Sequence, residues 1–264
     1  MNIMLKTLIG VIFTGNILCL RAHDVSQLSL PRVETVLKRV VERSEKENEN
    51  DRTFNQRYSY TRTRATEYRN SEGDLKKREE KKSQNLPVVS SASFLPQPVG
   101  RSLGPQQNAG SKGSQTDSRI RGRALDKKDF SLDDDLLGRF KFTLAGRDTV
   151  NGRPMLLLDF KPANRTLPER NIKDRFINRA AGRVWVDEED YVLAKADLRL
   201  TEKVNVIGGL AGAVWAFRYA FNRERTPDGL WFTRKVDWHV EGREVVLRRT
   251  IDYHEEKTDV RRAW

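Results

Sequence analysis

The sequence contains a single cysteine, Cys19, among its 264 residues. It lies in the first apolar run, and the rest of the chain can form no disulfide, thiol nucleophile or thiolate metal site. Histidine is nearly as rare, with only His23, His239 and His254. No set of histidines and carboxylates has metal-ligand spacing, and neither a Gly-x-Ser-x-Gly elbow nor a phosphate-binding loop is present. We therefore expect neither a metal nor a cofactor.

Acidic residues are the remaining candidates for catalysis, and they gather in two short stretches. These are Asp133–Asp135 and Asp187–Asp190. Both occur where the chain is expected to turn, and aspartate is an ordinary turn and capping residue. We expect no catalytic residues, so the chain is predicted not to be an enzyme.

Long hydrophobic runs are also lacking. The apolar run Leu8–Leu20 is shorter than the ~20 residues of a membrane-spanning helix, follows Lys6, and precedes a small-residue cleavage site at Ala22. We predict a signal peptide over residues 1–22, cleaved after Ala22, and export to the periplasm of a Gram-negative envelope. An uncleaved N-terminal anchor is the alternative. Leu18 stands before Cys19 where a lipoprotein signal would have a small residue, which argues against lipid attachment.

Positive charge is in excess, with 49 Lys and Arg against 37 Asp and Glu and a net charge of +12. An exported chain with this charge meets anionic lipid head groups or acidic envelope polymers first, so we expect no nucleic-acid partner. The alternative is that the excess positive charge only keeps the protein soluble. The sequence does not indicate the oligomeric state.

The N-terminal part of the mature chain, residues 23–85, predicts a helix followed by the first strands. Pro31 suits a first helical turn, and the helix is expected to end in the charged run Glu42–Asp51. Its apolar residues follow helical spacing: Val33, Val36, Leu37, Val40 and Val41. A strand is expected over Thr53–Arg69, then a turn over Asn70–Asp74 and an edge strand over Leu75–Ser83.

Residues 86–124 have a different composition, rich in proline, glycine and serine and without apolar periodicity. Such a stretch cannot bury enough apolar surface to order itself and predicts a flexible insertion. It is either a lid or a spacer. Residues 125–264 would then complete the same domain.

The last third of the chain predicts strands whose large apolar side chains keep to one face. Trp215, Phe217, Tyr219 and Phe221 alternate with small or polar residues, which is a period of two. Asn151-Gly152 between two strand runs predicts a type I′ hairpin. The short connections indicate an antiparallel meander of about nine strands. Its apolar face must be covered by helices, by another sheet or by a ligand.

One stretch resembles a known family. It runs Gly182-Arg-Val-Trp-Val-Asp-Glu-Glu-Asp-Tyr-Val-Leu-Ala-Lys-Ala-Asp and leads into a Leu-Arg-Leu strand; later come Trp231-Phe-Thr-Arg and Arg248-Arg-Thr-Ile-Asp-Tyr. With the N-terminal helix and the meander, these pieces resemble the outer-membrane lipoprotein-sorting proteins of the LolA/LolB superfamily. The resemblance implies an α+β fold, an incomplete β-barrel whose apolar concave face is closed by helices and takes up acyl chains.

This resemblance implies a carrier or sorting factor that binds lipid or an acylated lipoprotein. The alternative is an envelope-stress sensor or scaffold of the same fold, which binds a protein partner without transferring lipid. The candidate ligand-binding residues are the apolar ones of one parity: Phe142, Leu144, Leu156, Leu158, Phe160, Leu198, Trp215, Phe217, Tyr219, Phe232, Trp238, Leu247 and Ile251.

Two arginines and one glycine-rich segment complete the candidates. Arg234 and Arg249 share the parity of the apolar residues, so they either meet an anionic head group at the rim or reach water at a bulge or strand end. The segment Val206–Val214 is either a mobile cover over the cavity or a membrane-touching loop, or else a buried crossover between strands.

Overall fold

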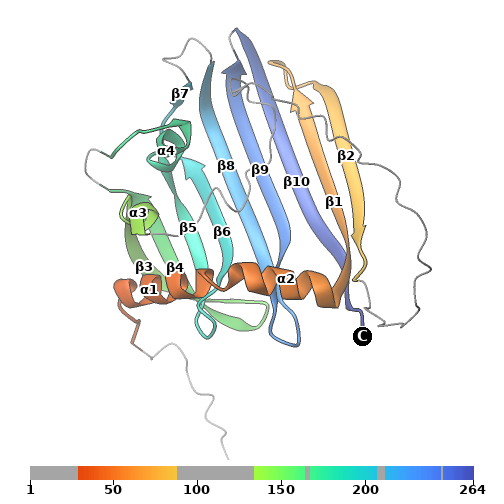
Figure 1. Ribbon diagram of the computed structural model, residues 1–264. Helices are drawn as coiled ribbons and strands as arrows, with labels where there is room; N and C mark the ends of the chain where they lie inside the picture. The colour runs from red at the N-terminus through yellow and green to blue at the C-terminus, as the bar shows by residue number, and fades with distance from the viewer. Residues whose placement is uncertain (1–28, 88–133, 164–166, 207–211, 245) are drawn as a thin grey trace, which may run out of the picture.

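The computed structural model describes residues 29–87, 134–163, 167–206, 212–244 and 246–264. The predicted signal peptide, most of the predicted insertion and residues 207–211 of the Val206–Val214 segment lie outside these ranges. The described chain forms four helices and ten strands (Figure 1): α1 Val33–Ser44, α2 Glu47–Arg57, β1 Tyr58–Arg69, β2 Leu75–Asn85, α3 Asp134–Leu137, β3 Phe140–Val150, β4 Arg153–Pro162, α4 Ile172–Ile177, β5 Ala180–Asp187, β6 Leu193–Leu200, β7 Val204–Val206, β8 Gly212–Arg225, β9 Trp231–Glu244 and β10 Leu247–Arg262.

All ten strands belong to one sheet, in the order β2-β1-β10-β9-β8-β6-β5-β4-β3, with β7 paired to β8. Every described pairing is antiparallel. β2 and β3 form the two edges, and among the described strands they do not pair with each other, so the sheet stays open. The N-terminal β1 lies beside the C-terminal β10 (Figure 1). The predicted α+β fold, an open antiparallel half-barrel with an N-terminal helix, is confirmed.

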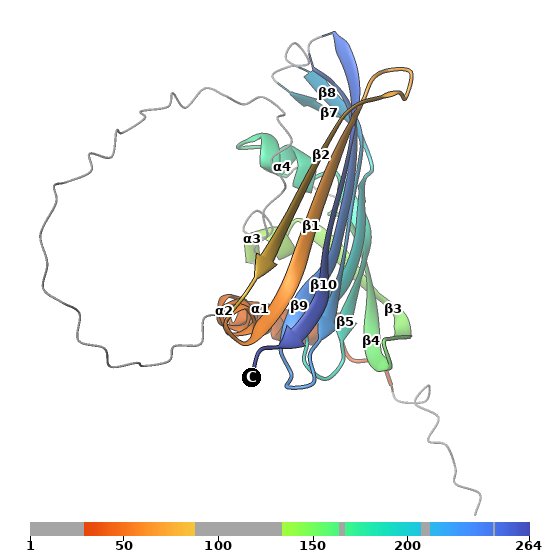
Figure 2. The ribbon, with the colours of Figure 1, turned by 90° about the vertical axis from the view of Figure 1, so that its right-hand side faces the viewer.

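The helices lie on one side of the sheet. Figure 2 shows α1, α2, α3 and α4 all on that side. We call this surface of the sheet the helix-side face, and the opposite surface the outer face. Because side chains alternate along a strand, every strand contributes residues to both faces.

The helix α1 forms where the sequence predicts it and packs on β3, β4 and β5. Its Val36 and Val40 are buried against Leu156, Leu158 and Val186. Burying a side chain of this size contributes about 1.5–3 kcal/mol, so this contact anchors the helix. The prediction of a core-facing helix is confirmed.

The helix α2 was not predicted, and the strand expected from Thr53 begins only at Tyr58. The cause is tertiary packing. Phe54 on α2 stacks on Phe232 of β9 with ring centroids 4.8 Å apart, and on Tyr58 at 5.2 Å. The helix brings the Phe54 ring against Phe232 and Tyr58, and the surrounding charged residues carry no strong β preference.

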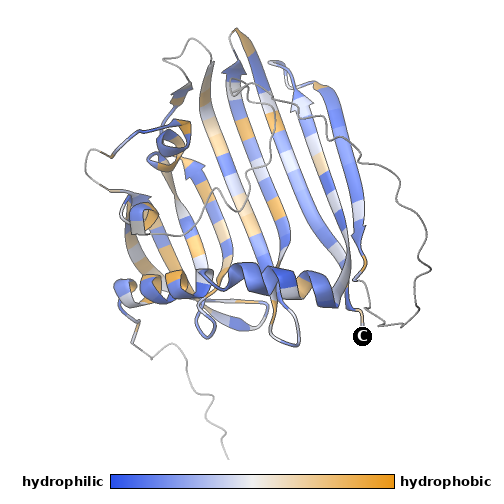
Figure 3. Ribbon diagram, viewed as in Figure 1, coloured by the Kyte–Doolittle hydropathy of each residue, from blue (hydrophilic) through white to orange (hydrophobic). Residues whose placement is uncertain are grey.

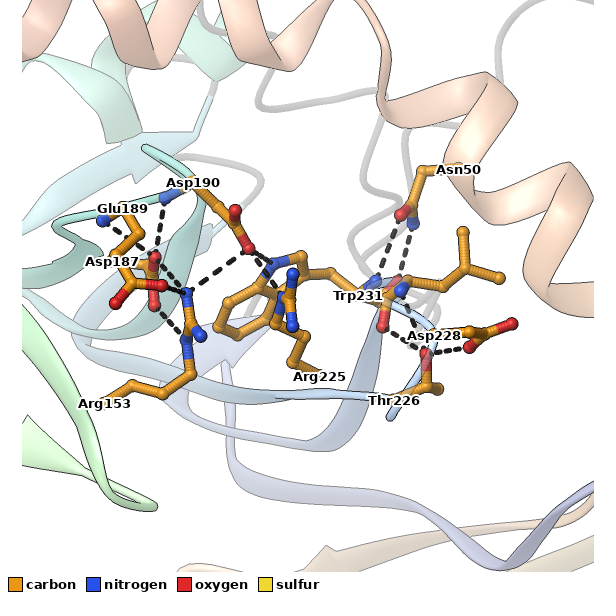
Figure 4. A network of polar contacts seen from close by, with 10 residues as sticks. Asn50, Arg153, Asp187, Glu189, Asp190, Arg225, Thr226, Asp228 and Trp231 are labelled. Carbon is orange, nitrogen blue, oxygen red and sulfur yellow. Dashed lines mark hydrogen bonds and ion pairs between the residues drawn. The ribbon is translucent and has the colours of Figure 1, made fainter.

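A polar clamp also holds α2 in place (Figure 4). The Asn50 side-chain amide donates to the Trp231 carbonyl at 2.6 Å and accepts from the Trp231 backbone N–H at 3.0 Å. The indole N–H of Trp231 donates to Asp190 at 2.8 Å. One residue of β9 is thereby joined to both α2 and the turn between β5 and β6.

The acidic run Asp187–Asp190 serves this turn, as its sequence context predicted. Asp187 is fully buried, and its carboxylate accepts the backbone N–H groups of Glu189 and Asp190 at 3.1 and 2.7 Å. Arg153 neutralises it through two hydrogen bonds of 2.6 and 2.9 Å. The hydrogen-bond donors to the Asp187 carboxylate are thus supplied by the protein itself.

The predicted hairpins also form. Asn151 and Gly152 both have positive φ, 51° and 76°, as a type I′ turn requires. Gly182, the first residue of the quoted motif, is needed for a different reason. A Cβ there would lie 2.1 Å from the Asp197 carbonyl oxygen on β6.

Replacing Leu158 by alanine should lower the free energy of unfolding by about 2–5 kcal/mol, because the site under α1 is closed and leaves a cavity. Urea denaturation measures the change. Leu75→Ala on the edge strand, where the side chain is half exposed, is the matched control and should cost under about 0.5 kcal/mol. Equal losses for the two variants would contradict the packing described here.

Candidate functional site

The centre of the helix-side face carries a surface of large side chains, which we call the central aromatic surface. It consists of Phe217, Tyr219 and Phe221 of β8, Val236, Trp238 and Val240 of β9, and Ile251 and Tyr253 of β10. The strand register aligns them in cross-strand rows. One row is Phe217, Val240 and Ile251; the next is Tyr219, Trp238 and Tyr253. The orange bands on β8 and β9 in Figure 3 mark part of this surface.

The helices cover this surface less than they cover the rest of the face. α1 contributes four residues to the cluster over β3–β5, and α2 contributes Phe54 to the cluster at the lower end of β9. In the central cluster, Phe176 of α4 is the one described hydrophobic residue that does not come from the sheet. Its ring meets Phe217 edge-on, with centroids 6.0 Å apart. This is the part of the face where a ligand could lie.

The structure divides the predicted ligand-binding residues between the core under α1 and the central cluster, whose Phe217, Trp238 and Ile251 are buried. Those near α1 are structural, and those in the middle form the candidate site. Phe142, Leu144, Leu156, Leu158 and Phe160 lie on β3 and β4; Leu198, Phe217, Tyr219, Trp238 and Ile251 belong to the central cluster; and Phe232 is stacked under α2.

Two further predicted ligand-binding residues, Trp215 and Leu247, belong to neither group. A bulge between Val214 and Ala216 breaks the alternation of β8, so Trp215 points to the outer face. There its indole N–H donates to Glu241 at 3.1 Å. Leu247 is 59% exposed at the first residue of β10, beyond the covered part of the sheet.

The predicted head-group arginines do not adjoin the central aromatic surface either. Arg234 occupies a bulge of β9 and lies 3.6 Å from Glu256 and 4.0 Å from Glu224. Arg249 lies near the start of β10, 3.2 Å from Glu244. Of the two predicted possibilities, both arginines therefore follow the second: Arg234 lies at a bulge and Arg249 near a strand end.

Sequence reasoning missed the charged residues that adjoin the central aromatic surface. Arg62 and Arg64 of β1 and Glu255 and Lys257 of β10 form what we call the ionic cluster. Arg62 donates to both carboxylate oxygens of Glu255 at 2.7 Å, and Arg64 approaches one of them at 3.4 Å. The sequence did contain one indication, because Glu255 and Lys257 continue the parity of Ile251 and Tyr253. The two arginines could not be placed beside them, since the pairing of β1 with β10 is not evident from the sequence.

Hydrogen bonds determine the protonation of Glu255. Burial by itself would raise the pKa of this carboxyl, but hydrogen bonds from Arg62 and Tyr253 outweigh burial and hold the pKa below its usual range. The Tyr253 hydroxyl donates to Glu255 at 2.7 Å. Burial and that bond raise the pKa of Tyr253. The cluster thus holds a fixed carboxylate beside protonated tyrosine.

Lys257 experiences the opposite effect. Burial, and then the positive charge of Arg62, lower its pKa to about 8. Its ammonium group lies over the rings of Tyr60 and Phe54, at 5.2 and 5.6 Å from their centroids. Among the described residues, no carboxylate lies within ion-pair distance of it. Lys257 is therefore a half-buried cation poorly compensated by the described residues.

Trp238 supplies a further polar group on this face. Its ring stacks on Tyr253 with centroids 5.2 Å apart, and the residue is 6% exposed. Its indole N–H is buried and has no hydrogen-bond partner among the residues that the structure describes. Such a group costs about 1–3 kcal/mol unless something accepts its proton.

The outer face is polar, and its charges compensate one another. A hollow of about 510 Å³ there includes His239 and His254, which fall on the wet parity as predicted. His239 bonds Asp252 at 2.6 Å and Glu241 at 3.0 Å, and His254 bonds Asp237 at 2.7 Å. Within the described ranges no group of three or more His, Cys, Asp or Glu is placed to hold a metal ion. This face presents ion pairs to solvent and no reactive constellation.

Comparison with known proteins gives distant structural likenesses. Neither the family models nor the curated proteins match the chain. Among solved structures, it is similar to a candidate outer membrane lipoprotein-sorting protein domain from Vibrio parahaemolyticus (12% identity, TM-score 0.34, 86% of this chain and 93% of that chain covered). It is also similar to a LolA superfamily protein from Nitrosomonas europaea (9%, 0.32, 88% and 94%) and to the MucA/MucB complex of Pseudomonas aeruginosa (10%, 0.22, 87% and 98%).

At these identities and TM-scores the likenesses carry no functional argument, and the half-barrel is established by the strand order itself. No helix in the described part of the chain combines the length and apolarity needed to cross a bilayer.

Lys257 should make stability depend on pH. The unfolded chain holds the lysine proton up to its ordinary pKa of 10.5, whereas the folded protein releases it near 8. The free energy of unfolding should therefore rise between pH 8 and 9.5, by about 2 kcal/mol. Urea titrations at several pH values measure this rise. Lys257→Met should abolish it, and Lys235→Met, which removes an exposed lysine of the outer face, should leave it intact. A rise that persists in Lys257→Met would show that another group causes it.

Proposed function

We propose that this is an exported, non-enzymatic binding protein that holds an acyl chain on the central aromatic surface, as a periplasmic carrier or sorting factor would. The observation that carries this proposal is the uneven covering of the helix-side face. α1 and α2 bring their hydrophobic residues to the clusters on either side, while Phe176 is the one described hydrophobic residue from a helix that packs on the central cluster. An apolar ligand would complete that covering.

The energetics favour such a ligand. Each methylene group removed from water contributes about 0.8 kcal/mol. A chain of eight methylene groups laid along the rows would yield about 6 kcal/mol before the cost of association. The polar outer face offers no comparable gain, because its residues already bond one another. An acyl chain would therefore bind the helix-side face.

The alternative is a protein that binds a protein partner without transferring lipid; the distantly similar MucB was crystallised in complex with MucA. Native mass spectrometry of protein purified without detergent separates the two. A carrier retains a mass of lipid or acylated peptide and passes it to added liposomes. A scaffold gives a clean apo mass, takes up nothing from liposomes and is crosslinked to a protein in the envelope. That second result would overturn the carrier proposal.

Val240→Glu tests the location of the chain. Val240 is half-buried in the row with Phe217 and Ile251, so a carboxylate there should reduce uptake of a fluorescent fatty acid at least tenfold. Lys235→Glu puts the same side chain on the exposed outer face and should bind as the parent does. Circular dichroism checks that both variants fold. Normal uptake by a folded Val240→Glu protein would show that the chain lies elsewhere.

A further inference from the structure

We propose that the ligand is an anionic amphiphile, whose acidic head group, a phosphate or carboxylate, is bound by Lys257 and Arg64 of the ionic cluster. Its acyl chain would lie on the central aromatic surface. This inference rests on the proposed function and names the chemical class of the ligand.

The first support is the continuity of the two surfaces. A single cross-strand row runs from the apolar edge of the sheet to its basic edge, and the register of every strand pair places its members side by side. In order from β3 to β2 they are Leu144, Leu158, Val184, Ala196, Phe221, Val236, Glu255, Arg64 and Lys81. An amphiphile lying along the middle of this row would meet Phe221 and Val236 first and the cations last.

The second support is the charge of the cluster. It holds three cations and one carboxylate, and that carboxylate is already occupied. Both oxygens of Glu255 accept from Arg62, and one also accepts from Tyr253. Asp51 acts on Lys257 only at a distance, and Glu47 pairs with Arg223 at 2.7 Å. Arg64 and Lys257 thus retain hydrogen-bonding capacity that an anion can satisfy.

The third support is independent of charge. The buried, unpartnered indole N–H of Trp238 lies in the row next to Val236 and Glu255, on the same face. An ester carbonyl or an acid oxygen near the head group would accept this proton. A plain hydrocarbon would leave it unpaired.

Titration calorimetry of the full chain, freed of lipid, tests the inference with three probes: dioctanoyl phosphatidic acid, its phosphatidylcholine analogue and inorganic phosphate. The phosphatidic acid should bind at least about tenfold more tightly than the neutral lipid, the lower limit expected for hydrogen bonds to charged groups. Oleate should compete with it. Inorganic phosphate alone should bind far more weakly, because it lacks the chain.

The variants locate the head group. Lys257→Gln and Arg64→Gln should each remove most of the preference for the anionic lipid, and Lys257→Arg, which keeps the charge, should retain it. Arg218→Gln on the outer face is the matched control and should change nothing. Trp238→Phe keeps an aromatic ring without the donor and should weaken lipid binding about fivefold.

The possible failures can be told apart. Equal affinity for both lipids, unchanged in Lys257→Gln and Arg64→Gln, would overturn the anionic head group but leave acyl-chain binding in place. Phosphate binding as tightly as phosphatidic acid would show a site for free anions and would also overturn it. Absence of binding by either lipid would refute the proposed function and this inference with it.

Discussion

The pairing of β1 with β10 is the constraint on which the helix-side face depends. These strands are separated by most of the chain, yet their register places Arg64 opposite Glu255 and Thr66 opposite Tyr253. A slip of one residue would move both arginines to the outer face and leave Glu255 buried without a cationic partner. The bidentate hydrogen bond from Arg62 to Glu255 stabilises this register and places the cations beside the aromatic rows.

A gradient of polarity across the sheet follows from this register. β3, β4 and β5 bury aliphatic residues under α1, the middle strands present aromatic rings, and β10, β1 and β2 bear charges (Figure 3). An ordinary core would be apolar throughout or sealed by helices. Here a half-buried lysine with a lowered pKa adjoins the aromatic rings, together with an indole N–H that is unpaired among the described residues. Proteins retain such costly groups most often where they bind something.

The sequence predicted the fold well because its signals are local. The alternation in β8 and β9, the Asn151-Gly152 turn and the valine stripe of α1 each depend on neighbouring residues. The failures were non-local. α2 forms because Phe54 reaches Phe232, and a bulge turns Trp215 outward. The ionic cluster exists only after β1 pairs with β10, which no local pattern indicates. The apolar half of the site was therefore predictable and the charged half was not.

Photo-crosslinking with a fatty acid that carries a diazirine in its chain tests the central claim most directly, since it identifies the residues that touch the ligand. The predicted adducts map to the helix-side residues of β8 and β9, Tyr219 to Phe221 and Val236 to Val240. Adducts at the outer-face Trp215, or none above the level of a denatured control, would contradict a ligand on the central aromatic surface.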